Sequence, residues 1–268
     1  MTTPNVPLRL ELEFELTARP EQIWDAIATT NGISAWFLPT EIEEREGGSI
    51  VVRMGEDMSS SGMVTGWEPP HRLVYSEPEW AEFTGHPGAA VSPMVSEFIV
   101  EAKSGGTCVL RVVSSAFGSG ADWEQEFFDD MAKHWVPFFD NLRLYLTHVA
   151  GRRVTSMDAS IQHAGRLDDV WRAVRETLGV SSAGERFDAR GVTGVVERLN
   201  VAPAPSELLV RVSDPMPGLL AFYAYGPTDG PCAIGVRGYL FSDDADDYVA
   251  REQPAWREWL HALAVPVP

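Results

Sequence analysis

The chain opens on a strict alternation of apolar and polar residues. Over Leu8–Leu16, leucine or phenylalanine takes every second position, and arginine or glutamate takes the positions between them. A period of two residues is typical of a strand with one face in a core and the other in water. The period then changes, because Ile23, Trp24 and Ile27 share one face of a helix that begins near Pro20. The sequence therefore predicts a strand followed by a helix.

Strand-like runs dominate the next part of the chain. The pair Asn31-Gly32 is expected to stop the first helix, and residues 33–37 are expected to form a second, short one. Strands separated by Gly-Gly and Pro-Pro turn signals are predicted over residues 40–46, 49–54, 62–68, 72–77, 96–102 and 107–115. Their spacing suits an antiparallel meander. Residues 78–93 interrupt it, and connections of this length are often functional or mobile.

The longest helical signal begins at Asp122. Apolar residues recur from there at alternating spacings of three and four, which predicts one stripe along a helix of about seven turns. The stripe consists of Phe128, Met131, Trp135, Phe138, Leu142, Tyr145 and Val149. Pro137 lies inside this helix and is expected to kink it or to open its hydrogen bonds locally. Gly151 is expected to end it.

The second half of the chain repeats this order of elements in a shorter form. It predicts a strand over 153–163, a helix over 168–178, strands over 192–199, 207–213, 219–225 and 233–241, and a closing helix with Trp256, Trp259, Leu260 and Leu263 on one face. The motif Trp24-Asp-Ala-Ile27 returns as Trp171-Arg-Ala-Val174. We interpret this as an internal duplication, with one domain over residues 1–151 and a degenerate second copy over 152–268.

Several short motifs within residues 8–150 together resemble one known superfamily. They are Pro20-Glu-Gln-Ile-Trp24-Asp-Ala-Ile27, Gly32-Ile-Ser-Ala-Trp36-Phe37, Gly48-Ser-Ile, Gly62-Met-Val, Pro70-His-Arg-Leu73-Val-Tyr75, Gly106-Thr107, Phe117, Trp135 and Leu142. This set resembles the START/Bet v 1-like (SRPBCC) superfamily, and within it the bacterial branch related to the C-terminal domain of the activator of Hsp-90 ATPase homologue. The second half resembles the superfamily in its element order.

The resemblance implies an α+β, helix-grip fold, in which a curved antiparallel sheet wraps a long C-terminal helix. In this superfamily a cavity often lies between the sheet and the helix, and it commonly holds lipids, sterols, polyketides or aromatic metabolites. The superfamily also contains aromatases, cyclases and a chaperone-binding domain, so the fold alone leaves the function open.

The composition of the chain excludes some classes of binding partner. The chain carries 39 Asp+Glu against 21 Lys+Arg, a formal net charge of -18, and residues 1–150 hold 23 of the acidic and 9 of the basic side chains. Nucleic acid is therefore not an expected partner. The sequence has neither an apolar run long enough to span a membrane nor the pattern of a signal peptide. We expect a cytoplasmic protein in which Cys108 and Cys232 are reduced and buried, and we predict no cofactor.

Aromatic residues supply a candidate binding site in the first domain. A ligand cavity needs apolar walls and a few convergent polar groups. The candidate lining residues are Trp36, Phe37, Trp67, Tyr75, Trp80, Phe83, Phe98, Arg111, Met131, His134, Trp135 and Phe138. The alternative for each apolar member is a position in a packed core.

The polar candidates carry alternatives of their own. If Arg111 faces inward, its guanidinium could bind a ligand carboxylate; if it faces outward, the orientation we favour, it pairs with Glu97 or Glu101. His134 could reach the edge of the cavity. We predict no catalytic residue and no metal ligand. The carboxylates around His86 have no metal-binding spacing, and the acidic run 243–247 is typical of a helix N-terminus.

The leading hypothesis is a protein that binds a small hydrophobic or aromatic molecule in a cavity of the first domain. One alternative is an enzyme like a polyketide cyclase or aromatase, which would need His134, Tyr75 or Arg111 to point into an open cavity. The other is a stress protein like a chaperone cofactor, with an unknown protein partner. A sheet–helix interface filled by side chains would count against the cavity.

Overall fold

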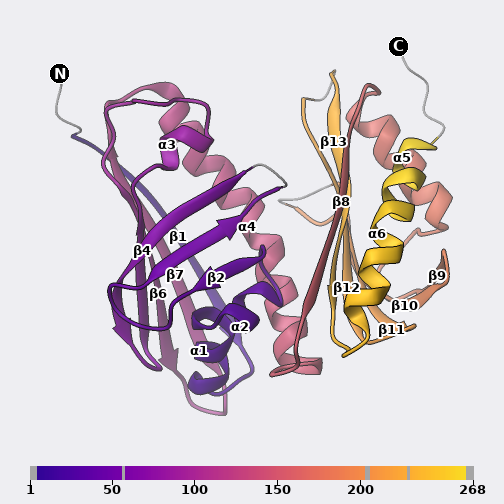
Figure 1. Ribbon diagram of the computed structural model, residues 1–268, viewed down its shortest axis with the longest axis horizontal. Coiled ribbons are helices and arrows are strands. Elements are labelled where there is room, and N and C mark those ends of the chain that lie inside the picture. Colours follow the sequence, from indigo (N-terminus) through magenta and orange to yellow (C-terminus); the bar gives the residue numbers. More distant parts are fainter. Residues whose placement is uncertain (1–4, 56–57, 203–205, 228–229, 264–268) are drawn as a thin grey trace. The chain divides into compact units, whose positions relative to one another are not determined.

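The computed structural model describes residues 5–55, 58–202, 206–227 and 230–263. The chain divides into two compact units, residues 1–151 (unit 1) and 152–268 (unit 2). Each unit has its own antiparallel sheet and its own C-terminal helix (Figure 1).

The described part of unit 1 forms a seven-stranded sheet in the order β1-β7-β6-β5-β4-β3-β2. Its elements are β1 (Val6–Leu16), α1 (Pro20–Ala28), α2 (Thr30–Ser34), β2 (Thr40–Ile42), β3 (Ser49–Arg53), β4 (Ser59–Glu68), β5 (Arg72–Glu77), α3 (Trp80–Phe83), β6 (Met94–Ala102), β7 (Cys108–Gly118) and α4 (Asp122–His148). The first strand therefore pairs with the last, and the rest follow as a meander. This is the helix-grip fold that the sequence predicts.

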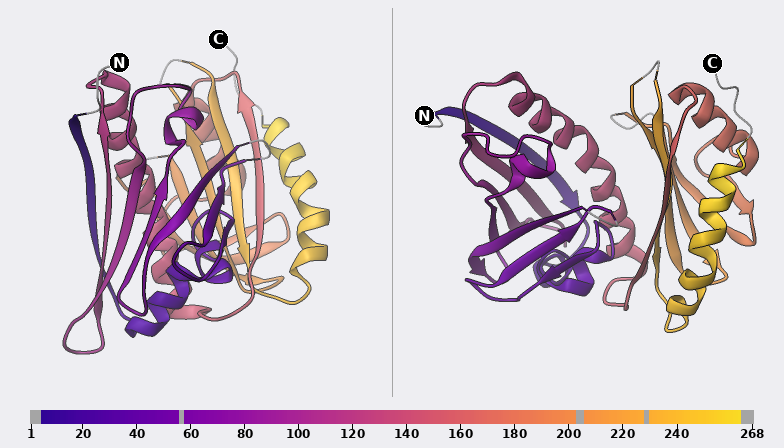
Figure 2. Two further views of the ribbon diagram at one scale, coloured as in Figure 1. Left: turned by 60° about the vertical axis from the view of Figure 1, so that its left-hand side comes forward. Right: turned by 45° about the horizontal axis from the view of Figure 1, so that its top comes forward.

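One face of this sheet carries the core of unit 1. The alternation along β1 places Leu8, Leu10 and Leu16 inward, where each is buried. Phe14 of the same face stacks on Phe139 of α4, with 3.9 Å between the ring centroids. The helix α4 lies along this face, with α1 and α2 toward one end of the sheet and α3 toward the other (Figures 1 and 2).

A buried carboxylate fixes the start of α4. Glu124 accepts hydrogen bonds from the backbone N–H and the hydroxyl of Ser119, at 2.9 and 2.7 Å, and from the N–H of Gly120 at 2.9 Å. Burial by itself raises the pKa of Glu124, but the hydrogen bonds together outweigh it and lower that pKa below its ordinary value. The ionised side chain thereby joins the end of β7 to the first turn of the helix.

The boundary between α1 and α2 differs from the prediction. The chain leaves the helical conformation at Thr29, whose φ and ψ are -114° and 149°. The Thr29 hydroxyl then accepts a hydrogen bond from the N–H of Gly32 at 3.0 Å, so α2 begins at Thr30 and contains Asn31-Gly32. A Cβ on Gly32 would lie 1.9 Å from the carbonyl oxygen of Asp25. Glycine therefore allows the two helices to approach; it does not stop the first one.

The connection between β5 and β6 contains the short helix α3, which the sequence analysis did not predict. Trp80 begins α3 and is fully buried, and its indole N–H donates to the carbonyl of Ser92 at 2.8 Å. A buried indole needs such a partner. Most of the predicted boundaries of the other strands in unit 1 agree with the structure to within three residues, although β2 ends at Ile42 and not at residue 46.

The described part of unit 2 repeats this topology with fewer elements. Its six-stranded sheet has the order β8-β13-β12-β11-β10-β9. The elements are β8 (Thr155–His163), α5 (Leu167–Leu178), β9 (Arg186–Ala189), β10 (Val192–Leu199), β11 (Glu207–Asp214), β12 (Gly218–Tyr225), β13 (Cys232–Leu240) and α6 (Ala245–His261). The sequence analysis did not predict β9. The tandem helix-grip fold is confirmed, with the first and last strands of the sheet paired in both copies.

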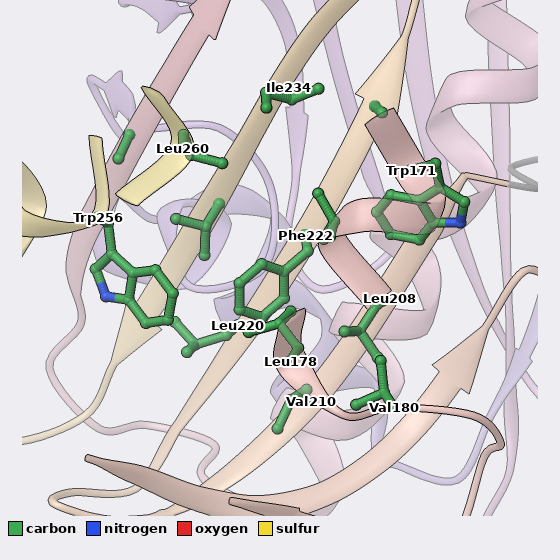
Figure 3. Close-up of a cluster of buried hydrophobic side chains, with 14 of the residues drawn as sticks. Trp171, Leu178, Val180, Leu208, Val210, Leu220, Phe222, Ile234, Trp256 and Leu260 are labelled. Carbon is green, nitrogen blue, oxygen red and sulfur yellow. The ribbon is translucent and has the colours of Figure 1, made fainter. Parts of the chain in front are cut away.

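A continuous apolar core fills the interior of unit 2. The helices α5 and α6 cover the same face of its sheet (Figure 2). Between them, Phe222 of β12 packs against Trp256 of α6, with 5.5 Å between ring centroids, and Trp171, Leu208 and Ile234 lie in the same cluster (Figure 3). The acidic run at 243–247 starts α6, where Asp246 pairs with Arg153 at 2.7 Å. Cys232 of unit 2 and Cys108 of unit 1 are both free and buried.

Candidate functional site: an aromatic pocket in unit 1

An aromatic pocket lies between α4, α2 with the residues that follow it, and the sheet of unit 1. Its lining consists of Ile33, Trp36, Phe37, Tyr75, Phe98, Trp135 and Phe139. The lining contains six aromatic side chains and no charged one. The centre of a water molecule can move through only about 10 Å³ between these side chains. The pocket therefore has room for a single water. The open, ligand-sized cavity that the sequence analysis expected is therefore not preformed here.

Trp36 is held rigidly at the base of this pocket. Its indole N–H donates to the carbonyl of Ala26 at 2.8 Å, and the amide of Asn141 on α4 donates to the Trp36 carbonyl at 3.2 Å. The ring is 1 % exposed and lies 5.3 Å, centroid to centroid, from that of Phe139. Through these two hydrogen bonds, Trp36 is attached both to α1 and to α4.

The opposite wall is looser. Trp135 and Phe138 of α4 are only partly buried, and both contact Phe37 edge-on, at 5.7 and 4.8 Å between ring centroids. Between them in the sequence stands Pro137, which has no N–H and cannot hydrogen-bond the carbonyl of Lys133. The helix turn that carries Trp135 is therefore held by fewer backbone hydrogen bonds than its neighbours.

A row of hydroxyl groups crosses the sheet beside the pocket. Tyr75 of β5 stands directly opposite Ser96 of β6, and Ser96 stands directly opposite Ser114 of β7. The Ser96 and Ser114 hydroxyl oxygens are 2.9 Å apart and both residues are fully buried. Tyr75 is 3 % exposed, and it is the member of this row that lines the pocket.

A buried carboxyl lies on the same face, two residues after Tyr75. Glu77 is 7 % exposed and accepts a hydrogen bond from the Ser60 hydroxyl. Burial raises the pKa of Glu77 above its ordinary value, and the Ser60 hydrogen bond only partly offsets this effect. Burial, reinforced by the charge that Glu77 would carry, also raises the pKa of Tyr75. Both groups are therefore held toward their neutral forms.

The structure brings five of the twelve candidate residues to the pocket: Trp36, Phe37, Tyr75, Phe98 and Trp135. Phe138 contacts the pocket from outside through Phe37. Three others lie in a separate cluster near α3, where Trp80 stacks on Phe127 and Phe83 and Met131 pack nearby. This cluster also holds His86, whose ring stacks on Trp123 at 3.9 Å. It is a packed core, which was the alternative for these positions.

The remaining three candidates face elsewhere. Trp67 packs edge-on against Trp24 of α1, at 4.9 Å between ring centroids. Arg111 pairs with Glu101 at 3.0 Å, which is the outward orientation that we favour from the sequence, and it does not line the pocket. His134 is exposed on α4 and is not among the residues that line the pocket.

Two lining residues, Ile33 and Phe139, are not among those predicted from the sequence. The three-four spacing places Phe138 in the stripe, but in the structure Phe139 is the buried residue, at 2 % exposure. Between Trp135 and Leu142 both Phe138 and Phe139 fit a spacing of three and four residues, so the spacing alone does not choose between them. Ile33 lies on α2, whose start depends on the Thr29 cap.

In the described part of the chain, His, Cys, Asp and Glu side chains form no group of three or more that could hold a metal ion. None of the helices described is both long and apolar enough to cross a membrane.

The topology and the sheet–helix interface define unit 1 as a helix-grip domain of the START/Bet v 1-like (SRPBCC) class. Residues 17–147, just under half of the chain, match the sequence model of the family described as Activator of Hsp90 ATPase homolog 1-like protein. This match covers most of unit 1, and it agrees with the resemblance that the motifs around Trp24 and Trp36 indicate. No curated protein matches the chain.

Several solved structures are similar to the chain. CalU16 from Micromonospora echinospora is 19% identical, with a TM-score of 0.40, over 51% of this chain and 73% of that one. Two others extend over both units. The di-domain ARO/CYC BexL from the BE-7585A biosynthetic pathway is 15% identical, with a TM-score of 0.43, over 95% of this chain and 93% of that one. DynU16, a putative protein in the dynemicin biosynthetic locus, is 17% identical, with a TM-score of 0.41, over 97% of both chains.

Proposed function

We propose that unit 1 binds a small hydrophobic or aromatic molecule between α4 and the sheet, at the pocket around Trp36. The observation that carries the proposal is the uncharged, almost wholly aromatic lining, which faces a helix turn weakened by Pro137. Because the pocket holds only one water as it stands, the ligand enters when the Trp135 ring swings outward. The space that this ring leaves fits a bicyclic aromatic molecule, since indole is itself one.

The cyclase alternative needs a polar group that faces the ligand. Of the three residues considered for that role, only Tyr75 lines the pocket, because Arg111 is paired on the outer face and His134 is exposed. A neutral tyrosine can orient an oxygen of the ligand, but proton abstraction needs a base near its working pH. The lining of the pocket therefore favours binding over catalysis.

The test is titration of the full-length protein with 2-acetylnaphthalene, followed by the indole N–H signals in ¹⁵N–¹H NMR spectra. We expect saturable shifts of the Trp36 and Trp135 signals and none of the Trp171 signal in unit 2. Trp135→Ala should bind about tenfold more tightly, because the pocket no longer has to open. Trp123→Ala, in the cluster near α3, is the matched control and should bind like the wild type.

The absence of any saturable shift in the wild-type protein would overturn the proposal, even if Trp135→Ala binds the probe. Native mass spectrometry of protein purified from its own host complements the titration, because a small molecule that co-purifies with unit 1 would identify the natural ligand.

A further inference from the structure

The Trp135 ring is a part of the pocket wall that can leave its place at low cost. The indole N–H groups of Trp36 and Trp80 each donate to a backbone carbonyl at 2.8 Å, whereas that of Trp135 donates to no group in the described part of the chain. The Trp135 ring is also only partly buried, and it projects from the turn of α4 that precedes Pro137. Moving this ring outward therefore breaks no hydrogen bond and exposes less apolar surface than moving a fully buried ring.

Two other rings define the space that the Trp135 ring fills. The Phe98 ring is nearly parallel to it, with 6.5 Å between centroids and 26° between planes. The Phe37 ring stands edge-on to it, at 5.7 Å and 71°. Parallel and edge-on contacts are the two arrangements that aromatic rings prefer. The site is therefore shaped around a flat aromatic ring.

Both of these neighbouring rings are fixed by their own contacts. Phe98 is buried on β6, between its fully buried cross-strand partners Leu73 of β5 and Val112 of β7. Phe37 follows α2, and its backbone N–H donates to the carbonyl of Ile33 at 3.0 Å. A molecule that takes the place of the indole therefore meets these two rings in the same positions.

The positions of the two rings decide which molecules fit well. A flat aromatic molecule can lie parallel to the Phe98 ring and meet the Phe37 ring edge-on, as the indole does. A saturated ring system of the same carbon skeleton is puckered and carries hydrogens on both faces. It is therefore thicker, and it makes the parallel contact only if Phe98 moves within a packed core. It also lacks the π face that the edge-on contact needs.

We propose that Phe98 and Phe37 make the pocket selective for flat, fused aromatic rings over saturated ring systems such as sterol or terpene skeletons. In the unbound protein, the Trp135 ring occupies the place of the ligand. This inference rests on the proposed function of unit 1 as a binding domain. Phe98 and Phe37 contact the ligand, and Trp135 gives way to it.

Two probes with the same carbon skeleton test the selectivity. They are 2-acetylnaphthalene and its ring-saturated counterpart trans-2-acetyldecalin, and both carry the same ketone. Isothermal titration calorimetry of the full-length protein should show about tenfold tighter binding of the naphthalene, because two aromatic contacts add to the burial of apolar surface. Burial alone would favour the decalin, which has the larger apolar surface, so the sign of the difference separates the two explanations.

Variants locate the source of the selectivity. Phe98→Leu and Phe37→Leu keep an apolar side chain but remove a ring, so each should lower the ratio of the two affinities to about threefold. Phe128→Leu, which removes a buried ring from the cluster near α3, is the matched control and should keep the wild-type ratio. Trp135→Ala should keep this ratio as well, because the indole has left the site whenever either probe is bound. The ratio is the informative readout, since a variant that merely loosens unit 1 weakens binding of both probes alike.

The two proposals fail in different ways. If neither probe binds the wild-type protein, the proposed function is wrong and the selectivity falls with it. If the decalin binds as tightly as the naphthalene or more tightly, the pocket binds ligands by burial alone and the selectivity for flat rings is wrong. If the naphthalene is preferred but both leucine variants keep the full ratio, Phe98 and Phe37 are not its source. The wild-type ratio needs no variant, so the selectivity can be read even if Phe98→Leu does not fold.

Discussion

At the scale of single residues, Glu77 is a buried side chain of unit 1 whose protonation is linked to folding. Its pKa is raised, chiefly by burial, so the folded protein holds this proton more tightly than the unfolded chain does. The free energy of unfolding must then fall as the pH rises from the ordinary range of a carboxyl group through the raised pKa of Glu77. At lower pH, Glu77 is protonated in both the folded and the unfolded protein, so it does not reduce the free energy of unfolding in this way.

Replacing Glu77 by glutamine removes this dependence, because an amide does not ionise. We expect Glu77→Gln to gain stability relative to the wild type as the pH rises from 5 to 8, by about 1 kcal/mol or more. Urea unfolding at several pH values measures this. The matched control is Glu79→Gln, an exposed position just after β5, which should shift stability by less than about 0.5 kcal/mol. A stability difference for Glu77→Gln that stays constant with pH would contradict the assignment.

At the scale of elements, α4 contributes two different parts of the pocket wall. Phe139 packs against the buried Trp36, whereas Trp135 is only partly buried, and Pro137 lies between these two residues in the sequence. Pro137→Ala restores a backbone N–H to a helix turn that lacks one, so exchange of the amides near Trp135 should slow by about fivefold or more. Since opening of the pocket then costs more, binding of 2-acetylnaphthalene should weaken. Hydrogen exchange read by mass spectrometry checks the first effect, and the NMR titration checks the second.

The second copy offers a matched control for this prediction. Pro254 lies inside α6 of unit 2, as Pro137 lies inside α4. Pro254→Ala should slow exchange in α6 and leave binding of the probe unchanged. If both substitutions weaken binding equally, the effect does not come from the turn at Trp135.

The periodicity of the sequence predicted most elements well because their burial is regular. The long helix is found at 122–148, and the strict alternation over residues 8–16 is found as the strand β1. The failures lie where a local contact overrides the pattern. The Thr29 cap moves the start of α2, and contacts with Trp36 and Phe14 bury Phe139 where the spacing allowed either Phe138 or Phe139. Whether an aromatic residue enters the pocket or a neighbouring core, as for Trp80, depends on tertiary packing that spacing does not encode.

At the scale of the whole molecule, the chain carries one topology twice, with different interiors. Unit 1 encloses a pocket walled by aromatic rings, whereas the described interior of unit 2 is a continuous apolar cluster around Phe222 and Trp256. The acidic excess and most of the aromatic residues belong to residues 1–150. The proposed binding therefore belongs to one copy, and the other has kept the fold without the same cavity lining.

Each unit has its own sheet, helix and core, so residues 1–151 should fold as an isolated fragment. We expect dispersed NMR signals, cooperative thermal unfolding and binding of 2-acetylnaphthalene with the affinity of the full chain. The matched control is the fragment 1–136, which ends just before Pro137 and lacks Phe139, Leu142 and Leu146. It should not unfold cooperatively, because these buried side chains cover the sheet. If 1–151 is unfolded under conditions in which the full chain is folded, the core of unit 1 is not sufficient by itself.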